Sequence, residues 1–119
     1  MSIKDINGVA DEKHIYLKTI GRKTKNPHMV ELWFAVVEGK IYLSHEGAYT
    51  DWMKNILKDD HVEFRIGDHR FKGIARIFPD GVAFKIGKNA LYLKYYGKAS
   101  KEVIDDWFSE STVIEINCS

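Results

Sequence analysis

Cysteine is nearly absent from this sequence. Cys118 is the only cysteine among 119 residues, so one chain can form neither a disulfide framework nor a CxxC metal or redox motif. This usage is typical of a reducing compartment, and we expect a cytoplasmic protein. At 13.8 kDa the chain has the size of one domain, so we expect residues 1–119 to form a single domain.

Long apolar segments are also missing. The apolar run at residues 32–37 is among the longest, and it is far shorter than the roughly 20 residues that cross a bilayer as a helix. The first residues do not combine a basic start with an apolar stretch, as a secretory signal peptide does. We therefore expect no membrane span and no membrane partner.

Neither sign of charge is in large excess, because 18 basic residues face 17 acidic ones and the formal net charge is +1. A near-neutral chain has no strong field to attract a long polyanion, which argues against nucleic-acid binding. The charges are nevertheless uneven. Residues 13–30 contain no Asp or Glu but five cations, Lys13, Lys18, Arg22, Lys23 and Lys25. Such a local cationic site suits a small anionic ligand.

Several catalytic motifs have no match in the sequence. There is no GxGxxG and no GxSxG, and the segment Gly81–Lys88 has one residue too many between its glycines for a phosphate loop. His45-Glu46 begins like a zinc-protease helix, but no histidine follows at the required spacing. We predict no metal site and assign no catalytic side chain, so a reaction at this protein should depend on a bound cofactor.

Alternation of apolar and polar residues with a period of two is the main signal, and it predicts strands. The clearest hairpin joins residues 62–66 to residues 71–77 through the turn residues Gly67-Asp68. Four further strands are expected, the first two of them joined by a polar basic segment, at residues 14–20, 28–37, 41–44 and 112–116.

Helical spacing is confined to short segments. A helix within residues 48–60 is expected to begin near Thr50. A second is expected around residues 88–96, closed by Gly97, and a third over residues 100–108. Six strands with hairpin connections and short helices favour a small antiparallel barrel, because closure removes exposed sheet edges. An open sheet with helices on one face is the alternative that the sequence leaves open.

Two segments carry a recognisable combination: Leu17–Thr24 running into Pro27–Phe34, and Ser44–Gly47 followed by Asp51–Ile56. Together they resemble the deazaflavin-dependent nitroreductase family, whose members are similar to flavin-binding split β-barrels of the pyridoxamine-phosphate-oxidase type. A weaker likeness extends over most of the remaining chain. The resemblance implies a mainly β fold with short helices, a six-stranded antiparallel split β-barrel, and a homodimer.

Site residues are implied by their positions in these segments. The basic loop is similar to a phosphate-binding loop, the segment after the third strand lies beside the ring system in the family, and the following helix supports it. The cofactor-binding residues that the resemblance implies are Arg22, Lys23, Thr24, Lys25, His28, Ser44, His45, Gly47, Trp52 and Asn55. Lysine and arginine on such a loop can offer charge-assisted hydrogen bonds to a phosphate.

Aromatic residues near the C-terminus are candidates for the substrate side of the site. Flat rings stack on a flavin face and their hydroxyls can orient a substrate, which singles out Tyr95 and Tyr96. At helical spacing such residues are more often part of a core, and the sequence does not decide between these roles.

The resemblance implies an oxidoreductase that uses a deazaflavin coenzyme of the F-420 type, or FMN, for hydride transfer to a small-molecule acceptor. Lys25 stands where many relatives have glycine and His28 where many have arginine, so the choice of cofactor stays open. The alternative is a non-catalytic β-barrel module that binds a flavin-like ligand or a short single-stranded nucleic acid.

Overall fold

A computed structural model of the protein describes residues 3–20, 27–97 and 111–118. The helices and strands follow one another in the order α1 (Ile3–Gly8), β1 (Ile15–Ile20), β2 (Pro27–Leu32), β3 (Ala35–Val37), β4 (Lys40–Glu46), α2 (Asp51–Lys58), β5 (His61–Ile66), β6 (His69–Phe78), α3 (Gly81–Tyr96) and β7 (Ser111–Cys118).

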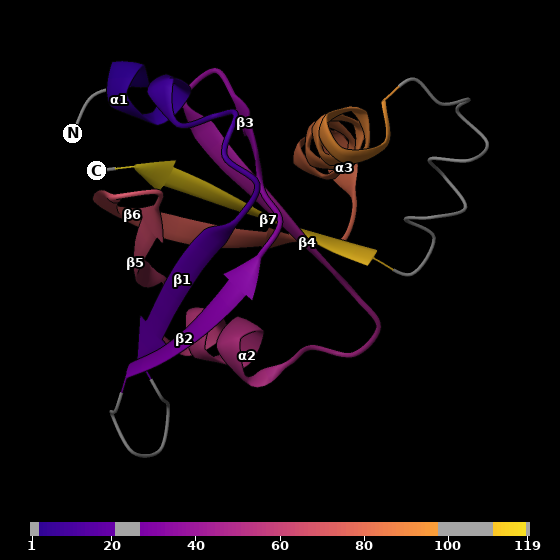
Figure 1. The fold of residues 1–119 in the computed structure, drawn as a ribbon. Coiled ribbons are helices and arrows are strands. Elements are labelled where there is room, and N and C mark those ends of the chain that lie inside the picture. The colour runs from indigo at the N-terminus through magenta and orange to yellow at the C-terminus, as the bar shows by residue number, and fades with distance from the viewer. Residues whose placement is uncertain (1–2, 21–26, 98–110, 119) are drawn as a thin grey trace.

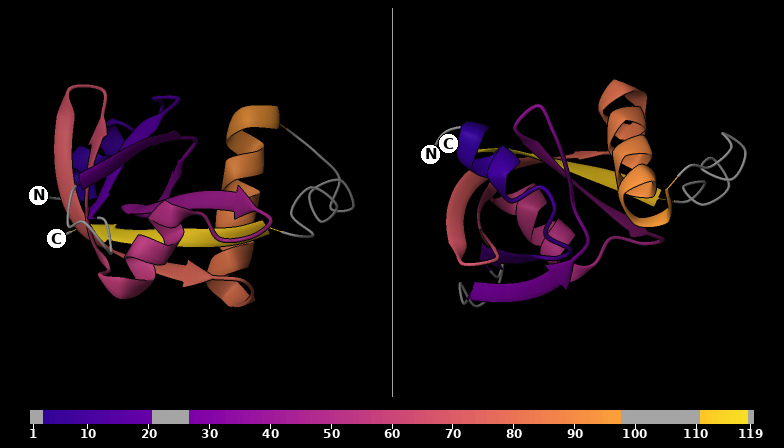
Figure 2. Two further views of the ribbon diagram at one scale, coloured as in Figure 1. Left: turned by 90° about the horizontal axis from the view of Figure 1, so that it is seen from below. Right: turned by 45° about the horizontal axis from the view of Figure 1, so that its top comes forward.

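All of these strands belong to one antiparallel sheet with the order β2-β1-β5-β6-β7-β4-β3. The sheet curls into a half-barrel, as Figures 1 and 2 show, and its interior is filled by apolar side chains. Its edge strands β2 and β3 are not paired with each other in the described part of the chain, so the barrel stays split between them. The expected mainly β class and split-barrel architecture are confirmed.

The strand count differs from the prediction, because the sheet has seven strands and not six. The expected strand at residues 28–37 is divided by Trp33 and Phe34 into β2 and β3. β2 pairs with β1, whereas β3 pairs with β4 at the opposite edge of the sheet. The break therefore carries the chain across the opening of the split barrel, which an uninterrupted strand could not do.

Apolar side chains fill the interior because they alternate along the strands. In β5, Val62, Phe64 and Ile66 are buried while Glu63 is exposed. Helix α2 contributes Trp52, Met53 and Ile56 to the same core, which also contains Leu17, Ile41, Leu43, Ile114 and Ile116. α2 packs against β1 and β6, and α3 packs against β3, β4 and β7.

The helices depart from prediction in two places. α3 begins at Gly81, several residues earlier than expected, and it ends at Tyr96 with Gly97 as its C-cap residue, as predicted. α1 was not predicted, although Ile6 is fully buried in the core. Thr50 is the N-cap residue of α2, but its side chain forms no capping hydrogen bond. The expected helix at residues 100–108 lies outside the described residues. Within residues 3–20, 27–97 and 111–118, no helix has the length and apolar character to span a bilayer.

Candidate functional site

The predicted phosphate-binding residues Arg22, Lys23, Thr24 and Lys25 lie outside the described residues. In the sequence they stand between Ile20 and Pro27, which are register partners in the β1–β2 pair. His28 follows on β2, opposite Thr19. The backbone position of His28 is described, and its side chain is not.

Asn55 links helix α2 to this end of β1. Its side chain is 2% exposed, and its Nδ2 donates a hydrogen bond of 3.0 Å to Oγ1 of Thr19, which is also buried. A buried polar pair of this kind is stable only when both groups are satisfied. The sequence assigned Asn55 to the helix beside the cofactor, and the structure holds that helix next to the strand that leads into the basic segment.

The turn between β4 and α2 leaves polar groups available. Gly47 has a φ of +80°, which favours glycine, and a Cβ atom added there would meet nothing within 4 Å. Thr50 has a buried Oγ1 with no hydrogen-bond partner among the described residues. The first backbone N–H groups of α2 also lack a side-chain cap. This turn therefore combines an exposed glycine with a buried hydroxyl that has no described partner.

Ser44 and His45 are adjacent on β4 and therefore face opposite sides of the sheet. His45 shares its side with the core residues Ile41 and Leu43, and its ring meets the edge of Trp52 at a centroid distance of 6.4 Å. Trp52 is 6% exposed and belongs to the core. The side chains of Ser44 and His45 therefore point to opposite faces of the sheet, although the sequence predicted both of them as cofactor-binding residues.

Ser44 lines a hollow of about 370 Å³ at the opening of the split barrel. One side of the hollow is formed by residues at the ends of β1 and β2, and the other side by residues of β4 and α3. The lining residues are His14, Glu31, Leu32, Trp33, Ser44 and Leu91. Its volume lies within the usual range for small-molecule sites. The residues come from both sides of the opening, so the hollow depends on the break between β2 and β3.

Trp33 is the aromatic wall of this hollow, and the sequence analysis did not single it out. Its side chain is 42% exposed, and its ring stacks on that of Tyr95 with 4.3 Å between centroids and 7° between planes. The missed signal was its position inside an apparently continuous strand, where a tryptophan is expected to pack into a core. Because the strand breaks there, the indole faces the opening.

The hydroxyl of Tyr95 is held by backbone groups. It accepts a hydrogen bond from the N–H of Phe34 at 3.0 Å and lies 2.7 Å from the carbonyl of Lys13 and 2.9 Å from that of Phe34, either of which can accept its proton. Burial raises the pKa of this hydroxyl, and its bond to Phe34 opposes the shift. Tyr95 therefore positions Trp33 beside the hollow. The side chain of Tyr96 is not described.

Lys94 supports the same junction from α3. Its Nζ donates to the carbonyl of Phe34 at 2.9 Å and lies 3.6 Å from the centroid of the Phe34 ring. Burial lowers the pKa of Lys94 to about 8, against the attraction of Asp11 and Glu12. The cation is thus partly desolvated behind the wall that Trp33 and Tyr95 form.

The site residues fall into two groups at opposite ends of the opening. Thr19 and Asn55 lie at the Pro27 end of β2, which follows the basic segment in the sequence, while the hollow lies at the Leu32 end of β2. Five strand steps separate these ends, or about 17 Å. An elongated ligand could reach both groups by lying along β2, whereas a small one could reach only one.

Comparisons with known proteins identify the family and the fold of the chain. A model of the F420H(2)-dependent quinone reductase family matches residues 5–93. The conserved hypothetical protein Rv2991 of Mycobacterium tuberculosis is 24% identical, with a TM-score of 0.82 over 99% of this chain and 81% of that chain. No curated protein sequence matches the chain.

Two further solved structures share the fold at lower identity. An F420-H2 dependent reductase (FDR-A) is 15% identical, with a TM-score of 0.70 over 87% of this chain and 93% of that one. A pyridoxamine 5′-phosphate oxidase-like protein of Listeria innocua is 16% identical, with a TM-score of 0.68 over 98% and 93%. At these identities the structures establish the split-barrel fold and nothing finer.

Proposed function

The chain belongs to the F420H(2)-dependent quinone reductase family, and we propose that it is an oxidoreductase that uses a reduced deazaflavin to deliver hydride to a small quinone-type acceptor. The observation that carries the proposal is the hollow beside Ser44 and Trp33, which opens at the Leu32 end of β2, whereas the basic segment precedes the Pro27 end in the sequence. This separation suits a coenzyme with a flat ring at one end and an anionic group at the other.

The described residues fit such a coenzyme by their chemistry. Trp33 offers an exposed flat ring, Leu91 an apolar contact and Ser44 a hydroxyl. The open space beside Gly47 leaves room for a ligand at the turn between β4 and α2. Arg22, Lys23, Thr24, Lys25 and His28 stay predictions for the anionic end.

The protein contributes binding and orientation, and the reduced deazaflavin supplies the hydride when it is bound. The Trp33 ring can stack on a planar group, because Tyr95 holds it in place from behind. Ser44 can orient a carbonyl or ring nitrogen by hydrogen bonding. A quinone that accepts hydride and a proton leaves as the quinol, so no protein nucleophile is required.

The experiment is anaerobic oxidation of reduced F420 by a soluble naphthoquinone, followed by absorbance with quantification of the quinol. We expect protein-dependent oxidation with equal amounts of oxidised coenzyme and quinol. Replacing the coenzyme by reduced FMN decides which cofactor the enzyme uses. Binding without turnover of either cofactor would contradict the proposal and favour the non-catalytic binding module.

A matched pair of variants links turnover to the hollow. Trp33→Leu keeps an apolar side chain but removes the flat ring, and we expect kcat/KM to fall about tenfold, as for the loss of one aromatic stacking contact. Met29→Leu is the control. Met29 lies on β2 and, like Trp33, is an exposed apolar residue, but it does not line the hollow. Equal losses of kcat/KM in the two variants would show that the hollow is not the site of the reaction.

We also propose a homodimer in the cytoplasm. An exposed apolar stripe on α3, formed by Val82, Ile86 and Leu93, is compatible with self-association. Light scattering tests the oligomeric state directly. A monomer that retains full activity would contradict the dimer without affecting the proposed reaction.

A further inference from the structure

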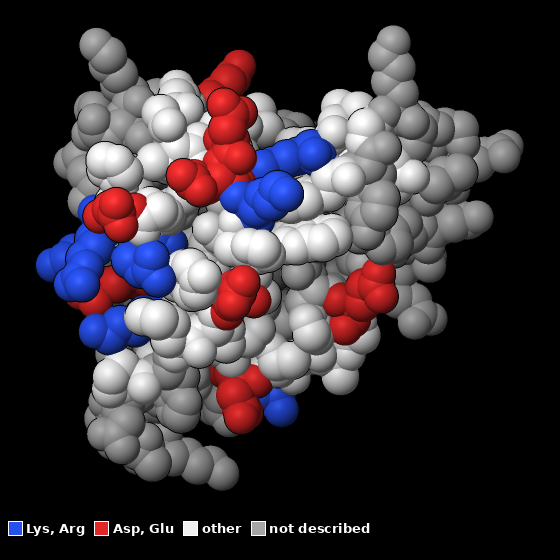
Figure 3. All heavy atoms as spheres, viewed as in Figure 1, with Lys and Arg blue, Asp and Glu red and all other residues white. Residues whose placement is uncertain are grey.

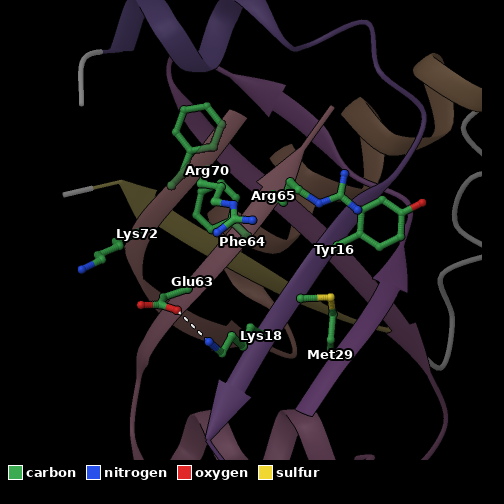
Figure 4. Close-up of a pocket in the computed structure, with 9 residues that line it drawn as sticks. Tyr16, Lys18, Met29, Glu63, Phe64, Arg65, Arg70 and Lys72 are labelled. Atoms are coloured by element: carbon green, nitrogen blue, oxygen red, sulfur yellow. Dashed lines mark ion pairs between the residues drawn. The ribbon is translucent and has the colours of Figure 1, made fainter. Parts of the chain in front are cut away.

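A second hollow, of about 460 Å³, lies on the outer face of the sheet (Figure 4). It crosses β2, β1, β5 and β6, and it shares no lining residue with the hollow beside Ser44. Four cations and one carboxylate surround it, together with aromatic residues and a methionine: Lys18, Arg65, Arg70, Lys72, Glu63, Tyr16, Phe64, Phe71 and Met29. We call it the outer groove.

The register of the sheet brings like charges together in the outer groove. Arg65 on β5 lies directly opposite Arg70 on β6, and Lys72 follows two residues later on the same face of β6. Like charges directly opposite each other destabilise a strand pair. Figure 3 shows Lys and Arg side chains gathered over the β5–β6 hairpin. This concentration stands out on a chain whose net charge is only +1.

Some of these cations are already held in place. Nη1 of Arg65 donates to the carbonyl of Gly67 at 2.7 Å, and its guanidinium carbon lies 4.2 Å from the centroid of the Tyr16 ring. Nζ of Lys18 is 3.3 Å from Oε2 of Glu63. Arg70, in contrast, is exposed and forms no ion pair with any residue that the structure describes. The groove therefore presents one fixed guanidinium next to one that is open to a ligand.

Apolar surface lies beside the cations. Tyr16 and Met29 both line the groove, and Met29 is 59% exposed. A flat or apolar group can rest on these two side chains while an anionic group reaches Arg70. Guanidinium groups bind phosphates and carboxylates through paired hydrogen bonds, which favours such a head group over a single halide ion.

We propose that the outer groove is a second binding site, for a small organic anion with a flat ring and a phosphate or carboxylate head group. The head group binds Arg70, Arg65 and Lys72, and the ring lies against Tyr16 and Met29. A concave site of this volume encloses a small molecule better than it fits a flat membrane surface. The outer groove is distinct from the opening of the barrel. The proposal therefore does not depend on which coenzyme the protein uses.

The first experiment locates binding by titrating the protein with ADP, pyrophosphate, phthalate and adenosine and recording proton–nitrogen correlation spectra. The titrations are repeated with saturating F420, because the basic segment could also attract phosphate. We expect ADP or phthalate to shift the amide signals of residues 16–18, 65 and 70–72 under both conditions, and to bind more tightly than pyrophosphate or adenosine. ADP and phthalate distinguish a phosphate from a carboxylate head group.

A matched pair of variants tests the assignment. Arg70→Gln should weaken binding of the preferred probe about tenfold, which corresponds to the loss of one charge-assisted hydrogen bond. Arg76→Gln is the control, since Arg76 is exposed on the same face of β6 but lines a different surface. Circular dichroism melting checks that both variants are folded.

Three outcomes would overturn the proposal. The first is the absence of shifts in the groove with every probe at millimolar concentration. The second is an equal loss of affinity in Arg70→Gln and Arg76→Gln, which would mean non-specific attraction. The third is binding to anionic phosphatidylglycerol vesicles with no binding of the small probes, which would assign this face to a membrane surface instead.

Discussion

Asn55 shows how much a single buried hydrogen bond can matter in this site. Asn55→Ala leaves the Oγ1 of Thr19 without its donor in a buried position, so we expect the free energy of unfolding to fall by about 1–3 kcal/mol. Urea denaturation measures the loss. Asn89→Ala is the control, because Asn89 is exposed on α3 and such a change is usually worth less than about 0.5 kcal/mol. An equal loss of unfolding free energy in Asn55→Ala and Asn89→Ala would mean that the Asn55–Thr19 hydrogen bond does not stabilise the fold.

Lys94 gives a pH-dependent prediction. Its pKa is lowered by burial from the ordinary 10.5 to about 8, so between these values the unfolded chain binds more protons than the folded one. The contribution of Lys94 to stability is therefore complete above the unfolded pKa and is lost as the pH falls through 8. We expect wild type to gain stability relative to Lys94→Met as the pH rises through this window, as urea denaturation can measure.

Tyr42 provides a control of opposite sign. Burial, and then its hydrogen bond to Glu115, raises the pKa of Tyr42 from 10.0 to about 12. Its contribution is present below the unfolded pKa and is lost as the pH rises through 12. The stability of wild type relative to Tyr42→Phe should therefore fall across that higher window. A difference between wild type and Lys94→Met that does not change with pH would contradict the buried position of the Lys94 ammonium.

At the scale of elements, the close approach of α3 to the sheet depends on Gly87. A Cβ atom at this position would lie 2.5 Å from Cγ1 of Val113 and 2.9 Å from Cδ1 of Tyr42. We expect Gly87→Ala to destabilise the fold by about 1–3 kcal/mol through overpacking, despite the roughly 1 kcal/mol that alanine gains in a helix. Thermal unfolding tests this.

Gly8→Ala is the matched control for that substitution. Gly8 ends α1, and a Cβ atom there would meet nothing within 4 Å. We expect its melting temperature to be unchanged or slightly raised. Should Gly87→Ala behave in the same way, α3 would not be packed against β4 and β7 as described.

Strands and helices in which apolar residues recur regularly were predictable from the sequence, and the others were not. The β5–β6 hairpin was predicted with its turn because the alternation stops at Gly67-Asp68 on both sides. The break at Trp33 and Phe34 was missed because apolar and β-branched residues continue through it. α3 was predicted only in part because it carries exposed apolar residues, such as Val82 and Leu93, beside its buried Leu91, which blurs the helical period.

At the scale of the whole molecule, the site arises from segments that are distant in the sequence. The family resemblance implies that Ser44, Gly47 and Asn55 are neighbours of a cofactor; in the structure Ser44 lines the hollow and Asn55 bonds to Thr19, while their contact with a cofactor stays a prediction. Trp33 could not be assigned from the sequence, because its exposure depends on the chain crossing between the two sheet edges. The sequence also did not show which face of β4 borders the opening. It therefore could not predict that Ser44 lines the hollow while His45 contacts Trp52.

The central claim is that one coenzyme spans the opening from the basic segment to Trp33. The most direct test is equilibrium binding of F420 to wild type, Lys23→Ala, Trp33→Leu and Lys85→Ala, combined with melting curves for each. Lys85 is the control because it is exposed on α3 and does not line the hollow. We predict micromolar binding to wild type and Lys85→Ala. Lys23→Ala should lose about 1–3 kcal/mol of binding free energy with an unchanged melting temperature, and Trp33→Leu about 0.5–1.5 kcal/mol. Failure of wild type to bind F420, or full affinity in both site variants, would contradict the claim.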